Sequence, residues 1–262
     1  MKNTEPILEV RDLVKDFGGV RALDHCSLRI MPGAITGIIG PNGAGKTTLF
    51  NLISGAMSPS HGEIFFDGRR IDGMRMHHAF GLGLMRTFQI PRELRRMTVL
   101  ENLLLVPGSQ TGERLWASWL MTRKVARQER RIEAKAMEVL ELLTLSHLAD
   151  EYAGNLSGGQ KKLLELARTL MADPKLVLLD EPGAGVNRTL LQSISQNILL
   201  ANVERGITFV IIEHDMRFVM SMCDPIIVVA NGSVIAEGTP TQIQQDPRVL
   251  EAYLGGRPRG SS

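Results

Sequence analysis

Cysteine is scarce in this sequence. Only Cys26 and Cys223 occur among its 262 residues, far apart and without the close spacing of metal ligands. Disulfide scaffolds need several paired cysteines, and structural zinc sites need ligands a few residues apart. The two cysteines therefore argue against both kinds of site and favour a protein of the reducing cytoplasm.

Long apolar runs and a strong net charge are also missing. No run approaches the roughly 18–20 apolar residues of a membrane-spanning helix, and residues 1–6 lack the apolar core of a signal peptide. With 30 basic and 28 acidic residues, the formal net charge of +2 is too small to indicate a nucleic-acid partner. We therefore expect a globular protein that is not exported, and its 44% hydrophobic residues suffice for a core.

Short β-type runs alternate with helical patterns along most of the chain. This alternation predicts an α/β protein with a largely parallel sheet. The apolar runs 176–179 and 208–212 are typical of buried parallel strands. Asn231-Gly232 lies between two further apolar runs and predicts a hairpin. Near the N-terminus, strands are expected at 7–13, 26–30 and 63–66, the first two joined through Gly18-Gly19.

The middle of the chain, from about residue 92 to residue 148, is helical in pattern. Apolar residues recur there at the i, i+4, i+7, i+8 and i+11 spacing of one helix face. They are Ile132, Ala136, Val139, Leu140 and Leu143. We interpret this stretch as a helical subdomain inserted into the α/β core.

The most specific motif spans residues 40–47, Gly-Pro-Asn-Gly-Ala-Gly-Lys-Thr, and matches the phosphate-binding pattern G-x-x-x-x-G-K-[ST]. A predicted strand (34–39) precedes it and a predicted helix (48–54) follows, as the motif requires. Its glycines let backbone N–H groups approach phosphate oxygens, and the helix start favours anions. Lys46 is expected to reach the β- and γ-phosphates, and Thr47 to offer its hydroxyl to Mg²⁺. The alternative is a glycine-rich turn that caps an ordinary helix.

Two carboxylates end the predicted strand 176–179. Asp180 is placed to hold Mg²⁺ through the water shell of the ion, and Glu181 to orient or deprotonate an attacking water. Solvated acids at a strand end are common, so this signal is weak alone. Beside a matching phosphate loop it favours a catalytic role.

A second glycine-containing string, Leu-Ser-Gly-Gly-Gln at residues 156–160, precedes a predicted helix at 161–171. Ser157 is a good N-terminal cap, and Gly158 and Gly159 expose backbone N–H groups at a helix start. The string therefore predicts a second anion site, with a flexible loop before a helix as the alternative.

In order and spacing, these motifs resemble those of the ATP-binding-cassette (ABC) ATPases. The resemblance covers about residues 7–254. It implies a P-loop NTPase (RecA-like) core with an N-terminal antiparallel β region and an inserted α-helical subdomain, with ATP and Mg²⁺ as cofactors. The ABC-type domain is then expected at 6–254, comprising core segments 6–89 and 156–254, a helical subdomain 90–155, and a disordered tail 255–262.

In ABC ATPases a signature string, which residues 156–160 match, contacts ATP bound to the opposing subunit. The resemblance therefore implies two cassettes that dimerise head to tail around two nucleotides, so that each chain carries two half-sites. The implied nucleotide contacts also include Phe17, which matches the aromatic residue that stacks on adenine; a core Phe is the alternative. The other implied contacts are Gly40, Pro41, Asn42, Gly43, Ala44, Gly45, Lys46, Thr47, Thr48, Ser157, Gly158, Gly159 and Gln160.

Two further roles come from the resemblance. Gln89 matches the loop glutamine that senses Mg²⁺ and water and joins the core to the helical subdomain, although a surface glutamine is the default interpretation of this residue type. His214 follows the strand 208–212 and matches the switch histidine that hydrogen-bonds the γ-phosphate. The implied catalytic residues are Lys46, Gln89, Glu181 and His214, and the implied Mg²⁺ ligands are Thr47, Gln89 and Asp180.

One position departs from the commonest family pattern. Asn187 stands where many cassettes carry the Asp of the subunit-communicating loop. Asn keeps hydrogen bonding but removes a charge, so we expect altered cross-talk between ATP sites with hydrolysis retained.

Four short segments, at 86–89, 184–187, 212–216 and 251–255, look like those of branched-chain amino-acid importer ATPases. That resemblance implies a second ATPase subunit in a hetero- or homodimer, integral membrane permeases, and indirectly an extracytoplasmic binding protein. It also implies peripheral attachment at the cytoplasmic face of the inner membrane and no nucleic-acid partner.

Alternatives remain open. ABC ATPases for urea or amide uptake, or for lipopolysaccharide or lipid export, share the nucleotide motifs. Soluble cassette proteins acting on ribosomes or DNA usually carry two cassettes or a long coiled-coil insertion, and neither occurs here. The intact carboxylates argue against a binding module without turnover.

In the helical subdomain, Trp116 and Trp119 are expected to pack internally, and the basic residues of 123–131 to form a solvated helix face.

Overall fold

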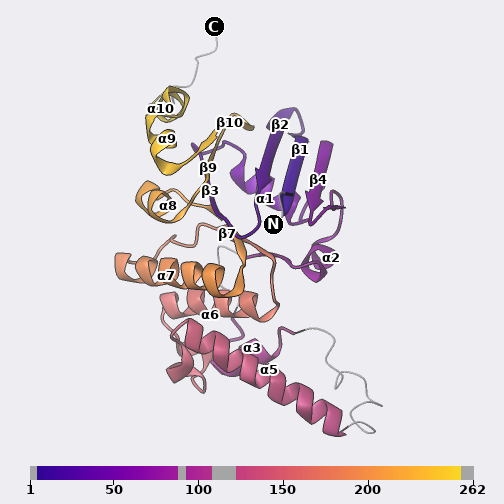
Figure 1. Ribbon diagram of the computed structural model, residues 1–262, viewed down its shortest axis with the longest axis vertical. Helices are drawn as coiled ribbons and strands as arrows, with labels where there is room; N and C mark the ends of the chain where they lie inside the picture. The colour runs from indigo at the N-terminus through magenta and orange to yellow at the C-terminus, as the bar shows by residue number, and fades with distance from the viewer. Residues whose placement is uncertain (1–4, 88–92, 108–121, 255–262) are drawn as a thin grey trace. The chain divides into compact units, whose positions relative to one another are not determined.

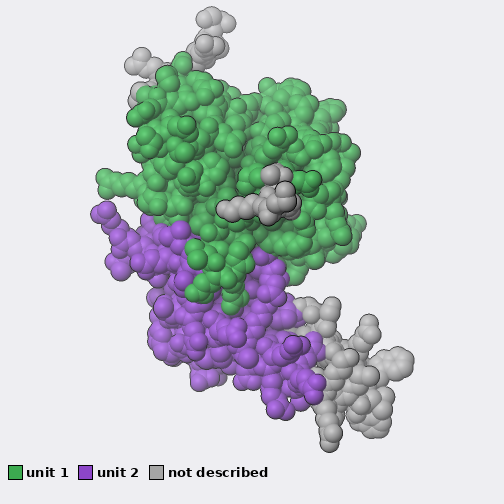
Figure 2. Space-filling model, viewed as in Figure 1, with its two compact units in different colours: residues 1–86, 175–184, 201–262 green, residues 87–174, 185–200 purple. Residues whose placement is uncertain are grey.

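The computed structural model describes residues 5–87, 93–107 and 122–254 (Figure 1). The chain divides into two compact units (Figure 2). Unit 1 comprises residues 1–86, 175–184 and 201–262, and unit 2 comprises residues 87–174 and 185–200. Among the described residues, no helix combines the length and the hydrophobicity needed to cross a membrane.

Six strands of unit 1 form one sheet. They are β3 (Ile35–Ile39), β6 (Leu84–Arg86), β7 (Leu176–Asp180), β8 (Thr208–Ile212), β9 (Ile226–Ala230) and β10 (Ser233–Gly238). Their order is β10-β9-β3-β8-β7-β6, with β10 antiparallel to β9 and all other pairs parallel. Every residue of β3, β7, β8 and β9 is buried, which explains their nearly continuous apolar sequences. The predicted parallel sheet and the predicted hairpin are confirmed.

A second sheet of unit 1 is antiparallel. Its strands are β1 (Leu8–Phe17), β2 (Val20–Ile30), β4 (His61–Phe66) and β5 (Arg69–Arg70), in the order β2-β1-β4-β5. Gly18 and Gly19 form the predicted turn, with Phe17 paired to Val20. β2 begins six residues before the expected residue 26, because its first half does not alternate regularly between apolar and polar residues, and Leu23 is its one buried side chain.

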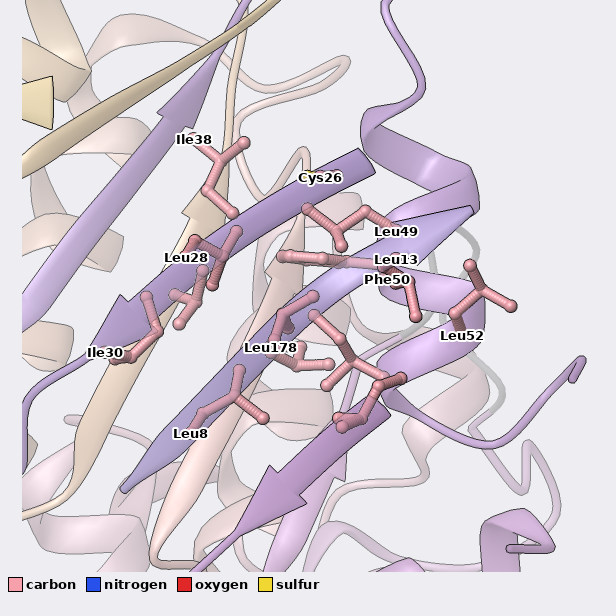
Figure 3. Packing of buried hydrophobic residues seen from close by; sticks show 14 of the residues in the cluster. Leu8, Leu13, Cys26, Leu28, Ile30, Ile38, Leu49, Phe50, Leu52 and Leu178 are labelled. Carbon is pink, nitrogen blue, oxygen red and sulfur yellow. The ribbon is translucent and has the colours of Figure 1, made fainter. Parts of the chain in front are cut away.

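The main core of unit 1 lies where helix α1 (Lys46–Ile53) packs against residues of both sheets (Figure 3). Leu49, Phe50 and Leu52 come from α1, which starts two residues before the predicted helix. Strands β1 and β2 contribute Leu8, Leu13, Cys26, Leu28 and Ile30, while β3 and β7 contribute Ile38 and Leu178. Burial of these side chains fixes the start of α1, and therefore the loop before it, against the sheet.

Unit 2 is helical. Its helices include α3 (Val99–Leu104), α5 (Thr122–Leu142) and α6 (Gly158–Met171), which contact one another. On the predicted apolar face of α5 and its continuation, Ala136, Val139, Leu140 and Leu143 are fully buried and Ile132 is half-buried. The spacing therefore identified the packed face of this helix.

The remaining helices follow strands of unit 1 or connect the two units. They are α2 (Met76–Gly81), α7 (Arg188–Arg205), α8 (Met216–Met222), α9 (Pro240–Gln245) and α10 (Pro247–Leu254). Residues 188–200 of α7 belong to unit 2 and its last residues to unit 1.

Both cysteines are buried free thiols, and burial raises the pKa of Cys26 to about 11 and that of Cys223 to about 12. Because the thiolate is the reactive form, a thiol reagent at about pH 8 should modify the folded protein slowly and both thiols rapidly after unfolding in urea. Following the release of a chromogenic thiolate measures both rates. Rapid modification of either cysteine before unfolding would contradict the burial.

Candidate active site

The loop between β3 and α1 has a backbone that only glycine fits at two positions. Gly40 has φ +155°, and a Cβ atom there would lie 1.9 Å from the carbonyl oxygen of Val229. Gly45 has φ +100°, and its Cβ would lie 2.5 Å from the carbonyl oxygen of Ala22. Any side chain at either position would push the loop away from these strands. The predicted strand, glycine loop and helix therefore occur as expected.

Lys46 is buried at the start of α1. Its Nζ donates to the carbonyl oxygens of Gly40 at 2.8 Å and Pro41 at 3.0 Å, so the ammonium lies inside the loop. Burial lowers the pKa of Lys46, whereas the negative charges of Glu181 and Asp180 act in the opposite direction. A cation held beside two carbonyls is placed to exchange them for phosphate oxygens, which are stronger acceptors.

The loop borders a hollow of about 270 Å³ in unit 1. Two residues far away in sequence, Glu181 and His214, line it together with the loop. The other lining residues are Ala22, Asn42, Gly43, Ala44, Gly45, Lys46, Thr47 and Thr48. The structure thus brings together three motifs that the sequence identified separately.

Asp180 ends β7 and is almost completely buried. Its Oδ2 accepts a hydrogen bond from Arg86 Nη2 at 2.8 Å, and Arg86 also donates to Asn51. The second oxygen, Oδ1, is buried and has no hydrogen-bond partner. Arg86 ends β6, the strand next to β7, so the sheet itself forms this ion pair. Sequence reasoning did not assign Arg86 a role, because the pairing depends on strand order.

The unpaired Oδ1 of Asp180 bears on the predicted Mg²⁺ site. A buried carboxylate oxygen without a donor fits a water molecule of a hydrated Mg²⁺ ion. Among the residues that the structure describes, no three His, Cys, Asp or Glu side chains gather to hold a metal by themselves. A metal here would therefore depend on Asp180, Thr47, water and the nucleotide, which is the usual mode for Mg²⁺.

Glu181 has left-handed backbone geometry, with φ +51°. Its amide donates to the carbonyl oxygen of Ile212 at 2.9 Å, and its Oε1 lies 2.8 Å from His214 Nε2. Left-handed geometry costs a residue such as Glu about 1–2 kcal/mol, and such strain is frequent at active sites. The contact holds the carboxylate of Glu181 and the imidazole of His214 side by side at the edge of the hollow.

Glu213 is a further buried carboxylate, to which the sequence analysis assigned no role. One oxygen accepts a hydrogen bond from the Gly183 amide, and the other accepts one from the His214 amide at 3.0 Å. Glu213 therefore ties the loop after Glu181 to the loop that carries His214. The only sequence signal was an acid at the end of an apolar strand, the same pattern that marked Asp180.

The signature string lies in unit 2. Ser157 caps α6, which begins at Gly158 rather than at the expected residue 161. Ser157 Oγ accepts from the Gln160 amide at 3.3 Å, and Gln160 Oε1 accepts from the Ser157 amide at 2.9 Å. Ser157 and Gly158 are exposed, whereas Gly159 packs so closely on Leu190 that a Cβ would lie 2.0 Å from that side chain. The predicted cap is confirmed, and exposed backbone remains at the helix start.

Other predicted residues lie apart from the hollow or outside the described residues. Phe17 is 45% exposed, with Lys15 Nζ 5.1 Å from its ring centre, so it is not a core residue. The side chain of Asn187 accepts a hydrogen bond from the Leu190 amide at 2.9 Å, which an Asp would also accept. Gln89, Trp116 and Trp119 lie outside the described residues.

Comparison with known proteins gives matches along nearly the whole chain. Residues 23–184, more than half of it, match the family described as ABC transporter. Residues 233–258 match the family described as branched-chain amino acid ATP-binding cassette transporter. A relative from Archaeoglobus fulgidus, described as a probable branched-chain amino acid transport ATP-binding protein LivG, is 45% identical over 251 residues, which are 96% of each chain.

Solved structures agree with these matches. The ADP conformation of MJ1267, an ATP-binding cassette of an ABC transporter, is 41% identical with a TM-score of 0.81, covering 96% of this chain and 100% of that one. The cassette MJ0796, solved as a dimer in a post-hydrolysis state with ADP and Pi, is 25% identical with a TM-score of 0.71, covering 89% and 98%. The chain belongs to the ABC transporter family, as an ATP-binding cassette that hydrolyses ATP.

Proposed function

We propose that this ATPase powers a bacterial importer for branched-chain, hydrophobic amino acids. The observation that carries the proposal is the match of residues 233–258 to the branched-chain family, because this segment lies outside the nucleotide motifs that all cassettes share. The description of the A. fulgidus relative supports the same cargo. Urea or amide uptake and lipid export remain the alternatives.

In the proposed transporter, this cassette pairs head to tail with a second one, identical or different. The phosphate loop of one chain and the string 156–160 of the other then enclose each nucleotide. The hollow of about 270 Å³ supports this arrangement, since complete ligand pockets run from roughly 300 to 1,000 Å³. The dimeric state of MJ0796 is a precedent within the family.

Within one chain, residues 40–48 bind the phosphates of ATP and Phe17 stacks on the adenine. Thr47, Asp180 and Gln89 hold Mg²⁺, which neutralises phosphate charge when bound. The unpartnered Oδ1 of Asp180 supports this assignment. Lys46 and His214 contact the γ-phosphate and stabilise the charge that develops on it during hydrolysis.

Glu181 is the proposed general base. It follows the Mg²⁺-binding Asp180, lines the hollow, and takes a proton from the attacking water. Its contact with His214 orients the carboxylate, and Glu213 fixes the two loops that carry this pair. ATP binding closes the dimer, and ATP hydrolysis returns the dimer to its open state.

Closure of the dimer is passed on to the permeases through the segment around Gln89. The cassette would then sit peripherally at the cytoplasmic face of the inner membrane, with the extracytoplasmic binding protein as an indirect partner. We propose that 6–254 is one ABC-type domain whose helical subdomain, 90–155, meets the permease. The proposed transporter has no nucleic-acid partner. Asn187 alters the communication between the two ATP sites of the dimer.

The cargo is tested by reconstituting the assembled complex in vesicles. Leucine, isoleucine and valine, supplied with the cognate binding protein, should be taken up with ATP and should stimulate its hydrolysis. Uptake of urea, or stimulation by lipid alone, would contradict the cargo assignment. A freely active ATPase that co-purifies with ribosomes would overturn the transporter itself.

Glu181→Gln should keep ATP binding but lower turnover about 10²- to 10⁴-fold, the usual contribution of a general base. Closed dimers should accumulate with MgATP. ATPase rates of the assembled complex and size-exclusion chromatography measure the two effects. Glu204→Gln, an exposed acid on α7, is the control. Normal turnover in Glu181→Gln would remove Glu181 from the role of base.

Glu213→Gln should lower kcat with little change in the Kd for ATP, because Glu213 is not among the residues that line the hollow. The amide can accept only one of the two backbone hydrogen bonds, and loss of a charge-assisted bond costs about 1.5–3 kcal/mol. We expect about a tenfold fall in kcat, measured beside the exposed control Glu237→Gln. A lower urea midpoint with unchanged kcat would indicate a purely structural role.

A further inference from the structure

Arg86, at the end of β6, has partners on two other elements of unit 1. Its side chain is only 12% exposed, and its Nε is buried without a hydrogen-bond partner. The terminal nitrogens make its hydrogen bonds instead. Nη2 donates to Asp180 Oδ2 at 2.8 Å, while Nη1 donates to Asn51 Oδ1 and lies 3.4 Å from Ser54 Oγ. One guanidinium therefore joins the end of β7 to helix α1 and the residue that follows this helix.

The surroundings of Arg86 fix the position of its guanidinium. Arg86 Cζ lies 5.8 Å from the ring centre of Phe50, a cation–π distance, and Phe50 is completely buried in the core of unit 1 (Figure 3). The backbone of Arg86 is held as well, because it pairs in register with Leu178 of β7, two residues before Asp180. A guanidinium fixed in this way holds the carboxylate oxygen that it meets and does not follow the carboxylate when it turns.

Asp180 depends on this one partner. In the part of the chain that the structure describes, Arg86 is the single hydrogen-bond donor to the Asp180 carboxylate. The other nearby cation, Lys46, donates to the carbonyl oxygens of Gly40 and Pro41 instead. A carboxylate buried as deeply as Asp180 is unfavourable without a paired cation. Arg86 therefore determines which of the two Asp180 oxygens is engaged and which stays available.

Asn51, the second partner of Arg86, lies on the same face of α1 as Thr47. Both residues belong to α1, and residues four apart in a helix lie one above the other on one face. Thr47 and Asp180 are two of the three proposed Mg²⁺ ligands. Through its two terminal nitrogens, Arg86 connects the helix that carries one of these ligands to the strand that carries the other.

We propose that Arg86 is a positioning residue for the metal of MgATP, which holds Asp180 Oδ2 so that Oδ1 is presented to the hydrated Mg²⁺. Hydrogen-bond partners of metal-binding side chains orient those side chains in the same manner. The bond to Asn51 keeps the guanidinium, and with it Asp180, in a constant place relative to α1. This inference rests on the Mg²⁺ role proposed above for Asp180, and the variants that follow distinguish the two.

Metal binding by the full-length chain tests the proposal. Mn²⁺ suits the same oxygen ligands as Mg²⁺, and the EPR signal of free Mn²⁺ measures its apparent Kd in the presence of a non-hydrolysable ATP analogue. Arg86→Gln should raise this Kd about tenfold, the lower end of the usual effect of losing the partner of a metal ligand. The Kd for a fluorescent form of the analogue in EDTA should keep its wild-type value. Arg69→Gln, an exposed arginine on β5, is the control and should change neither value.

Asp180→Asn in the same assay tests the proposed ligand itself. If this variant binds Mn²⁺ like the wild type, the Mg²⁺ role of Asp180 fails and the inference fails with it. If Asp180→Asn weakens metal binding but Arg86→Gln does not, the inference alone is overturned. In the double variant, Arg86→Gln should add nothing to Asp180→Asn, because its effect acts through this carboxylate. A further loss there, or an equal loss of nucleotide affinity in EDTA, would make Arg86 a purely structural residue.

Removing one partner of a buried ion pair is strongly destabilising, so Arg86→Gln can fail to fold. Arg86→Lys then takes its place, because lysine keeps the charge but cannot donate from two separate nitrogens to Asp180 and Asn51. A folded Arg86→Lys variant should still bind Mn²⁺ more weakly than the wild type, with the Kd for the analogue in EDTA unchanged. Wild-type metal affinity in this variant would overturn the proposal.

Discussion

The parallel pairing of β3, β8 and β7 is the constraint on which the active site depends. These three strands are neighbours in the sheet, and their registers align Ile38 with Ile212 and Ile212 with Asp180. Parallel strands end at the same edge, so the segments that follow them meet there. The phosphate loop lies more than a hundred residues before Glu181 and His214, yet strand order alone brings all three to one hollow.

Three carboxylates at this edge have different surroundings, and the differences support the separate roles proposed for them. Asp180 is buried and paired with Arg86, and its second oxygen has no hydrogen-bond partner, which suits the proposed hydrated metal ion. Glu213 is buried and bound by two backbone amides, so both of its oxygens are engaged in structure. Glu181 alone lines the hollow with a partly accessible side chain and a histidine beside it. Of the three, Glu181 therefore fits best the proposed role of meeting an attacking water.

Much of this arrangement was predictable from sequence because its signals are local. The phosphate loop, the Ser157 cap and the buried strand before Asp180 each lie within a few consecutive residues. Arg86 and Glu213 were not assigned roles, because their partners come from a neighbouring strand and from the loop after another strand. The start of β2 was placed late for a related reason, since its mostly exposed first half pairs with β1 but lacks the alternation that marks a strand in sequence.

The central claim is that the edge formed by β3, β8 and β7 is half of a shared ATP site. A crystal structure of the ATP-bound complex, with hydrolysis blocked, tests it most directly. The γ-phosphate should lie between Lys46 and His214 of one cassette and the signature string of the opposing cassette, with Glu181 facing the attacking water. A γ-phosphate enclosed by a single chain, or bound away from the loop at residues 40–47, would contradict this account.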